Sequence, residues 1–114
     1  MRKQNIENAA FEVAEQVRAV EDSIDAALAE IAELQGRMMR ARSVARVGLA
    51  TGHDALEKLA GATQSLVGAR GSMAACHAAL VEAKDFVPGL RTVSFGDGSE
   101  CPDTKGHAGL RIVA

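Results

Sequence analysis

Apolar and small residues recur every three or four positions through the first half of the chain. They are Ile6, Ala10, Val13, Val17, Val20, Ile24, Ala27, Ile31, Leu34, Met38, Ala41 and Ala45. This alternation places them along one side of an α-helix, and a series of more than three or four heptads is typical of a coiled coil. The positions between them are mainly acidic as far as Glu33 and basic from Arg37 onward. We therefore expect one long amphipathic helix over about residues 5–47.

A turn is predicted at residues 48–52, where the segment GLATG interrupts the heptad pattern. Thr51 and Asp54 have the spacing of a capping box, in which a hydroxyl and a carboxylate satisfy free N–H groups at the start of a helix. A second helix is expected over about residues 52–87, because Pro88 ends it. Its predicted seam has two stripes, one of Leu59, Leu66, Met73, Leu80 and Val87 and one of Ala62, Ala69, Cys76 and Ala83.

Residues 1–89 are therefore predicted to form one antiparallel helical hairpin. If the chain folds back at the predicted turn, the numbers of facing residues sum to about 100. Ile24 would then lie opposite Cys76, and Ala27 opposite Met73. Large side chains would meet small ones at these levels, which suits a close-packed interface. The predicted fold class is all-α: a long, coiled-coil-like hairpin that assembles into a helical bundle.

Residues 59–81 contain a single charged side chain, Arg70. A helix in water usually keeps a charged face, so a helix without one is usually covered on more than one side. Small residues line one face of this segment at helical spacing and would let a second helix approach closely. An alanine-rich exposed face is the alternative interpretation. The predicted self-association residues are Gly61, Ser65, Gly68, Ser72, Ala75 and Ala79. We expect a homo-oligomer, with a dimer favoured.

Residues 90–114 form a tail of different composition. Two short runs, RTVSF at 91–95 and LRIV at 110–113, flank a glycine-containing loop and could pair as a small β-hairpin. The alternative is an extended arm that becomes ordered only on a partner.

The net charge of −2 argues against a general nucleic-acid-binding protein. No run approaches the roughly 18 apolar residues of a membrane span. The N-terminal residues lack the apolar region of a signal peptide. We expect a cytoplasmic protein, with secretion without a leader or incorporation into a virion left open.

Four arginines make up the sharpest charged feature and a candidate partner patch: Arg37, Arg40, Arg42 and Arg46. They could bind an acidic protein or a nucleic acid. Alternatively, they neutralise Asp54, Glu57 or the acidic half of another copy's first helix. We favour neutralisation, because no aromatic residue accompanies the arginines for base stacking.

Histidines and cysteines are the candidate metal ligands: His53, His77, His107, Cys76 and Cys101. Bundle metal sites use Glu-x-x-His pairs, which the chain lacks. Cys76 and His77 are adjacent and would point about 100° apart on a helix. No nucleophile-elbow motif and no phosphate-binding loop is present. We therefore expect no catalytic residues, no metal and no cofactor, and a protein that is not an enzyme.

In architecture alone, the pattern resembles small bacterial or phage helical-hairpin assembly proteins and the secreted helical-hairpin class. The W-x-G turn of the secreted class is missing, since the turn reads GLATG, and no functional residues are carried over. The predicted function is a non-enzymatic helical interaction protein that acts through helix–helix association with itself and a protein partner. One alternative is a structural subunit of a larger assembly, such as a phage particle or secretion apparatus, with residues 90–114 as a linking arm. Another is a nucleic-acid-binding hairpin dimer that uses the arginines.

Overall fold

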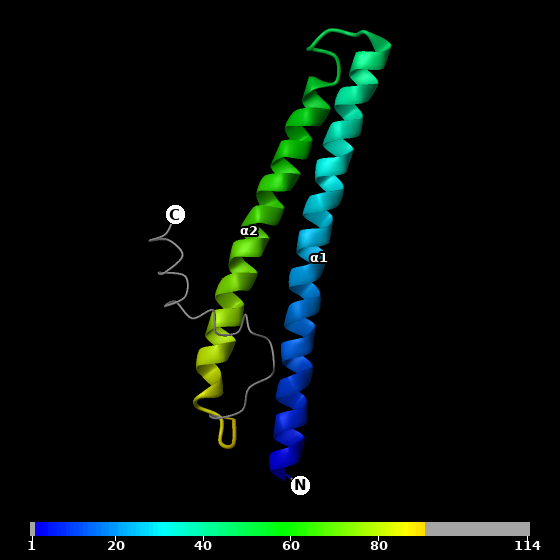
Figure 1. Ribbon diagram of the computed structural model, residues 1–114. Coiled ribbons are helices and arrows are strands. Elements are labelled where there is room, and N and C mark those ends of the chain that lie inside the picture. The colour runs from blue at the N-terminus through cyan, green and yellow to red at the C-terminus, as the bar shows by residue number, and fades with distance from the viewer. Residues whose placement is uncertain (1, 91–114) are drawn as a thin grey trace, which may run out of the picture. The chain divides into compact units, whose positions relative to one another are not determined.

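Two α-helices joined by a turn make up the part of the chain that the computed structural model describes, residues 2–90 (Figure 1). Helix α1 spans Arg2–Ala45 and contains 44 residues, and helix α2 spans His53–Lys84 and contains 32 residues. No strand occurs within residues 2–90. The all-α class is confirmed, and each helix ends within about three residues of its predicted limit. Residues 91–114, with the predicted β-hairpin, lie outside the described residues.

Helix α1 ends in a Schellman motif just before Gly48, the glycine at which the sequence predicts the turn. The N–H of Val47 donates to the carbonyl of Arg42 at 3.4 Å, and the N–H of Arg46 donates to the carbonyl of Ser43 at 3.2 Å. Arg46 has a φ of 55°, the left-handed conformation that the motif requires after the last helical residue. The guanidinium of Arg42 also donates to the carbonyl of Val47 at 3.1 Å. The helix therefore stops at an arginine in a conformation that favours glycine.

Helix α2 begins after Gly52, which has a φ of 81°. The carbonyl of Gly52 accepts a hydrogen bond from the N–H of Leu56 at 3.1 Å. The predicted capping box is wrong: Thr51 and Asp54 form no such pair within residues 2–90, and the Asp54 carboxylate accepts a hydrogen bond from Lys58 at 3.0 Å. Asp54 still lies in the first turn, where a carboxylate interacts favourably with the helix dipole.

The chain divides into two units, and both helices run through both of them. The turn unit is Val17–Ala74. The terminal unit is Met1–Gln16 with Ala75–Ala114, of which residues 2–16 and 75–90 are described.

In the turn unit, α1 and α2 lie side by side and antiparallel (Figure 1). Half-buried side chains line the seam between them. The half-buried apolar residues of α1 in this unit are Val17, Val20, Ile24, Ala27, Leu28, Ile31 and Met38. The half-buried residues of α2 in this unit are four apolar residues and one threonine: Leu56, Leu59, Thr63, Leu66 and Met73. The predicted series in α1 therefore marks the seam, except at Leu34, Ala41 and Ala45, which are exposed.

The second stripe predicted for α2 is wrong. All four of its members are exposed: Ala62, Ala69, Cys76 and Ala83. The seam of α2 instead runs one residue later in each heptad, through Leu56, Thr63, Arg70, His77 and Lys84. All of these residues except Arg70 are half-buried. Thr63 donates its hydroxyl to the carbonyl of Leu59 at 3.1 Å, and Arg70 bonds to α1. Polar side chains can occupy this seam because it is only half-buried and their hydrogen bonds are satisfied.

The register of the hairpin also differs from the prediction. Ile24 and Met73 line the same pocket, so facing residue numbers sum to 97 rather than about 100. The same register places Ile31 opposite Leu66, both half-buried. At these two levels large side chains meet large ones, where the prediction paired a large residue with a small one. Cys76, predicted to face Ile24, is exposed.

In the terminal unit, the chain after α2 turns back beside the start of α1. Gly89 has a φ of 88°, and a Cβ at this position would lie 3.5 Å from Cγ of Lys3. Leu90 follows and is only 5% exposed. In α1, Ala14 is half-buried, whereas the adjacent Val13, which was predicted to lie in the seam, is exposed. Glycine at position 89 therefore serves both the turn and the close approach of the lysine stem.

Burial within the described residues is shallow. Leu90 is the only buried residue between 2 and 90, and neither helix contains one. Val44 and Leu49, on either side of the end of α1, are 83% and 79% exposed. Each helix thus covers one stripe of the other and leaves the rest of its surface to solvent or to another chain.

Candidate functional site

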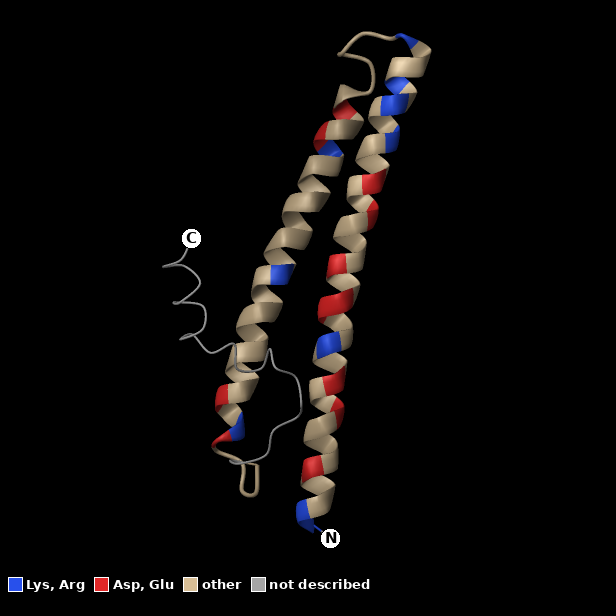
Figure 2. Ribbon diagram, in the orientation of Figure 1, with Lys and Arg blue, Asp and Glu red and all other residues tan. Residues whose placement is uncertain are grey.

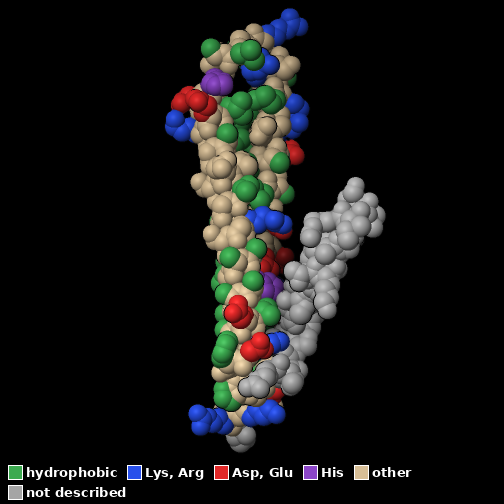
Figure 3. Space-filling view, turned by 90° about the vertical axis from the view of Figure 1, so that its left-hand side faces the viewer, with side chains coloured by type: hydrophobic (Ala, Val, Ile, Leu, Met, Phe, Trp, Pro, Cys, Tyr) green, Lys and Arg blue, Asp and Glu red, His purple; other side chains and the backbone are tan. Residues whose placement is uncertain are grey.

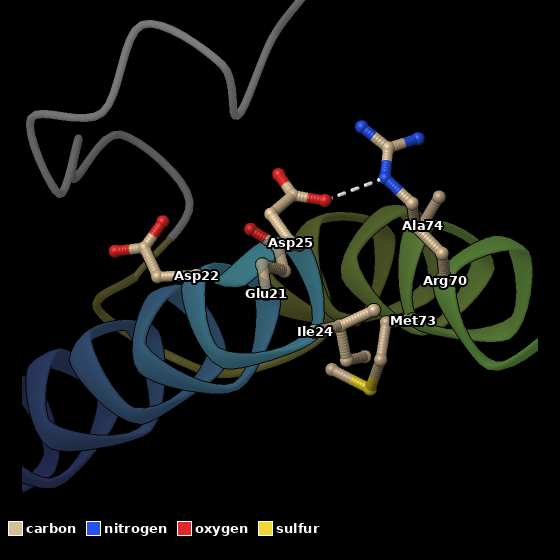
Figure 4. Close-up of a pocket in the computed structure, with 7 residues that line it drawn as sticks. All are labelled: Glu21, Asp22, Ile24, Asp25, Arg70, Met73 and Ala74. Atoms are coloured by element: carbon tan, nitrogen blue, oxygen red, sulfur yellow. Dashed lines mark hydrogen bonds and ion pairs between the residues drawn. The ribbon is translucent and has the colours of Figure 1, made fainter. Parts of the chain in front are cut away.

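The charged pair between the helices is the most defined polar site of the turn unit. Nε of Arg70 donates to Oδ1 of Asp25 at 2.7 Å (Figure 4). The hydrogen bond to Asp25 and the charge of its carboxylate raise the pKa of the arginine above its usual value, and the charge of Glu21 adds to this. The two side chains remain 62% and 57% exposed, so the pair orients the helices more than it stabilises them.

An open pocket lies beside this pair. Its lining combines acidic and apolar side chains from both helices: Glu21, Asp22, Ile24, Asp25, Arg70, Met73 and Ala74. Figure 4 shows Ile24 next to Met73, and Asp25 facing Arg70. The lining holds no pair of a nucleophile and a base, and its one cation is already bonded to a carboxylate. We therefore interpret it as a gap in the seam between the helices.

The six predicted self-association residues form one continuous exposed stripe on α2, here called the small stripe. Each follows a seam position by two residues, as Gly61 follows Leu59 and Gly68 follows Leu66, which is about 200° around the helix. All six are exposed. At Gly61, Gly68 and Gly71, an added Cβ would meet no described atom within 4 Å. The close approach that the glycines predict is therefore not made within residues 2–90 of one chain.

The side of α2 that carries the small stripe is almost free of charge. Arg70, the single charged residue between Leu59 and Val81, lies on the seam and bonds to α1. Figure 2 shows that most charged residues of α2 lie toward its two ends. Figure 3 shows few charged side chains between the two ends of α2. Val67, which lies about 120° around α2 from the centre of the stripe, is 53% exposed. The outward surface of this segment thus carries small, apolar and uncharged polar groups and no charged side chain away from the seam.

Three of the four clustered arginines are bonded inside the chain. Arg37 lies 2.9 Å and Arg40 3.4 Å from Oε2 of Glu33, and Arg42 caps the end of α1. Within one chain, the partner of these two arginines is therefore Glu33, one turn before Arg37 and two turns before Arg40, and not Asp54 or Glu57. The other predicted partner, the acidic half of another copy's first helix, stays a prediction. Arg46 adopts the left-handed conformation that ends α1. Arg37 and Arg40 thus share one carboxylate oxygen, whereas Arg42 and Arg46 belong to the turn that ends α1.

A second exposed stripe on α1 was missed in the sequence prediction. It lies two residues after each seam position and is here called the outer stripe: Ala19, Asp22, Ala26, Ala29, Glu33, Gly36 and Arg40. All of these residues except Gly36 are exposed. The signal was present, since the same alternation of three and four recurs on both sides of the helix. The seam series is the more apolar of the two, so apolarity alone does not identify the outer stripe.

The candidate metal ligands do not come together. No group of three or more His, Cys, Asp or Glu residues that could hold a metal ion occurs among the described residues. Within them, His53 and Cys76 are exposed and His77 is half-buried. His107 and Cys101 lie outside the described residues.

No helix within residues 2–90 has the combination of length and hydrophobicity needed to cross a membrane. Comparisons with protein-family models, with curated proteins and with solved structures found no match. The described residues thus define an all-helical chain of two paired helices whose apolar and small residues are only partly covered.

Proposed function

We propose that this chain is a non-enzymatic helical protein that acts by self-association through the small stripe of α2. The observation that carries the proposal is the absence of any buried residue in either helix of the described chain. Most helical stability in proteins comes from burial of an apolar face, and small chains with little core commonly gain stability by oligomerisation. A second copy would supply the burial that one hairpin lacks.

The small stripe is self-complementary in an antiparallel dimer. If facing residue numbers sum to about 140, Gly61 meets Ala79, Ser65 meets Ala75, and Gly68 meets Ser72. Every contact then joins two small residues, so the helix backbones can approach closely. The mid-helix glycines, each costing up to about 1 kcal/mol relative to alanine, would be offset by this approach. The result is a twofold arrangement of four helices with α2 central and α1 outside.

The alternative functions have different support. The proposal includes a protein partner, for which the exposed acidic part of α1 is available. Nucleic-acid binding is less well supported, because Glu33 and the carbonyl of Val47 bond three of the four arginines. A structural subunit of a larger assembly remains the runner-up. A cytoplasmic location belongs to the same proposal.

Mass in solution tests the proposal directly. Light scattering across a wide concentration range should show a dimer or a larger species, and the melting temperature should rise with protein concentration. A folded monomer at every concentration would contradict self-association as the function. In that case, affinity purification with the full chain would be the next step.

A further inference from the structure

The outer stripe of α1 carries opposite charges at its two ends. Asp22 lies near one end and Arg40 near the other, with Ala26, Ala29 and Gly36 between them. All of these positions belong to the turn unit. Asp22 forms no hydrogen bond or ion pair within the described residues, and Figure 4 shows its carboxylate directed away from Arg70. Arg40 reaches Glu33 at 3.4 Å while its side chain stays 67% exposed.

We propose that the outer stripe binds the outer stripe of a second copy of this chain in antiparallel orientation, with facing residue numbers that sum to about 62. In this register Asp22 faces Arg40 of the other copy, and the twofold axis repeats the pair. Ala26 faces Gly36, and Ala29 faces Glu33. The charge pattern of the stripe is thus complementary to itself.

Other orientations are excluded by charge. A parallel, in-register pair would place Asp22 against Asp22 and Arg40 against Arg40, and like charges across an interface are unfavourable. An antiparallel pair shifted by one heptad, with a sum of about 55, would place Asp22 against Glu33. A shift the other way would leave Asp22 outside the contact. Among registers that keep the stripe facing itself, the sum of 62 alone joins its opposite charges.

Gly36 gives the contact room. It lies within α1, where glycine is less favourable than alanine by up to about 1 kcal/mol, and it has no unusual backbone conformation. A Cβ at this position would meet only Nη1 of Arg40, at 3.4 Å. The Arg40 guanidinium that covers Gly36 would turn to Asp22 of the other copy, and an Ala26 methyl group opposite the uncovered glycine then permits close approach of the two helix backbones.

This inference extends the proposed function, because it adds a second self-associating surface to the small stripe. Two different twofold contacts on different helices of one chain join more than two copies, and they close into a dihedral assembly only when their axes intersect at a suitable angle. In any other arrangement, copies add on as filaments in which α2–α2 and α1–α1 contacts alternate. Assembly of this kind would make the chain a structural subunit of a larger assembly.

The contact is tested by reversing one charge of the Asp22–Arg40 pair and then exchanging both. Assembly is measured by light scattering and negative-stain microscopy at low salt. Wild-type protein should grow beyond a dimer as concentration rises. Arg40→Glu should raise the protein concentration needed for assembly beyond a dimer by about tenfold or more, and it should leave discrete dimers. The double variant Asp22→Arg with Arg40→Glu should restore growth, because the charges are exchanged. Arg46→Glu, with the same change in net charge but off the outer stripe, should assemble like the wild type.

Failure of this inference and failure of the proposed function give different results. A wild-type dimer that Gly68→Leu dissociates and Arg40→Glu leaves intact would overturn the outer-stripe contact and keep the small-stripe contact. A dimer that Arg40→Glu dissociates and Gly68→Leu leaves intact would overturn the small-stripe contact and keep the outer-stripe contact. Growth that the exchanged double variant does not recover would overturn the proposed register.

Discussion

Arg46 is an arginine in the conformation that glycine usually occupies at the end of a helix. Its φ of 55° closes the Schellman motif after α1, while Gly48, two residues later, has no positive φ. A non-glycine residue in the left-handed region is strained by contact between its Cβ and the following carbonyl oxygen. The local sequence is therefore not optimal for the turn that it forms.

Arg46→Gly should raise the free energy of unfolding by about 0.5–1 kcal/mol, because the relief of strain exceeds the entropy gained by the unfolded chain. Denaturant unfolding at fixed protein concentration measures the change. Ala41→Gly, at an exposed position inside α1, is the matched control and should lower stability by about 1 kcal/mol. A loss of stability in Arg46→Gly would show that the Schellman turn is not the populated one.

Ile24 and Met73 define the hairpin register at the level of single side chains. Because both are half-buried, Met73→Ala should cost about 1–2.5 kcal/mol, roughly half the loss at a fully buried site. A double-mutant cycle between Ile24→Ala and Met73→Ala should show a coupling of about 0.5 kcal/mol or more, since contacting residues are not additive. The cycle between Ile24→Ala and Cys76→Ala should be additive. Coupling in the second cycle instead would favour the predicted sum of 100.

At the scale of helices, the sequence was sufficient for α1 and insufficient for α2. The α1 series succeeds because its apolar residues are concentrated on one side, as in Val17, Ile24 and Ile31. In α2, alanines occur on every side, so apolarity does not distinguish Ala69, which is exposed, from Thr63, which lies in the seam. The register could not be derived from composition, because it depends on the Schellman turn at an arginine. Its pairing of large side chains and the Arg70–Asp25 bond become visible only once the helices are placed.

The candidate surfaces also divide into features that the sequence identifies and features that require the structure. The small residues of α2 could be grouped by spacing alone, and the structure shows that this stripe faces away from α1. The arginine cluster could be counted from the sequence, but the bonds of Arg37 and Arg40 to Glu33 depend on side-chain geometry over two turns of α1. The outer stripe required the position of the seam before its members could be recognised.

Gly68→Leu tests the small stripe at the level of the helix. Leucine has the better helix propensity, and a Cβ at this position meets no described atom, so the isolated hairpin should gain up to about 1 kcal/mol. In the proposed dimer, Gly68 lies near the twofold axis and the leucine would enter the contact twice. We expect loss of the dimer, measured by analytical ultracentrifugation.

Gly71→Leu is the control for that experiment, because Gly71 is equally open but lies about 75° away from the centre of the stripe. It should raise helix stability and leave the dimer intact. If Gly68→Leu also kept the dimer and became more stable, the small stripe would be an ordinary exposed face.

For the whole molecule, the central question is whether assembly is carried by the helices or by the residues that follow them. Proposed contacts through the small stripe and the outer stripe both lie within residues 19–79. Removal of residues 91–114 should then leave assembly unchanged, while retaining Leu90, the one buried side chain of the described part. If residues 90–114 act as a linking arm, the same truncation should abolish growth and leave dimers. The measurement is the concentration at which scattering departs from that of a dimer, compared between the full and shortened chains. Truncated protein that grows normally but stops growing with Arg40→Glu would assign assembly to α1 and α2 alone.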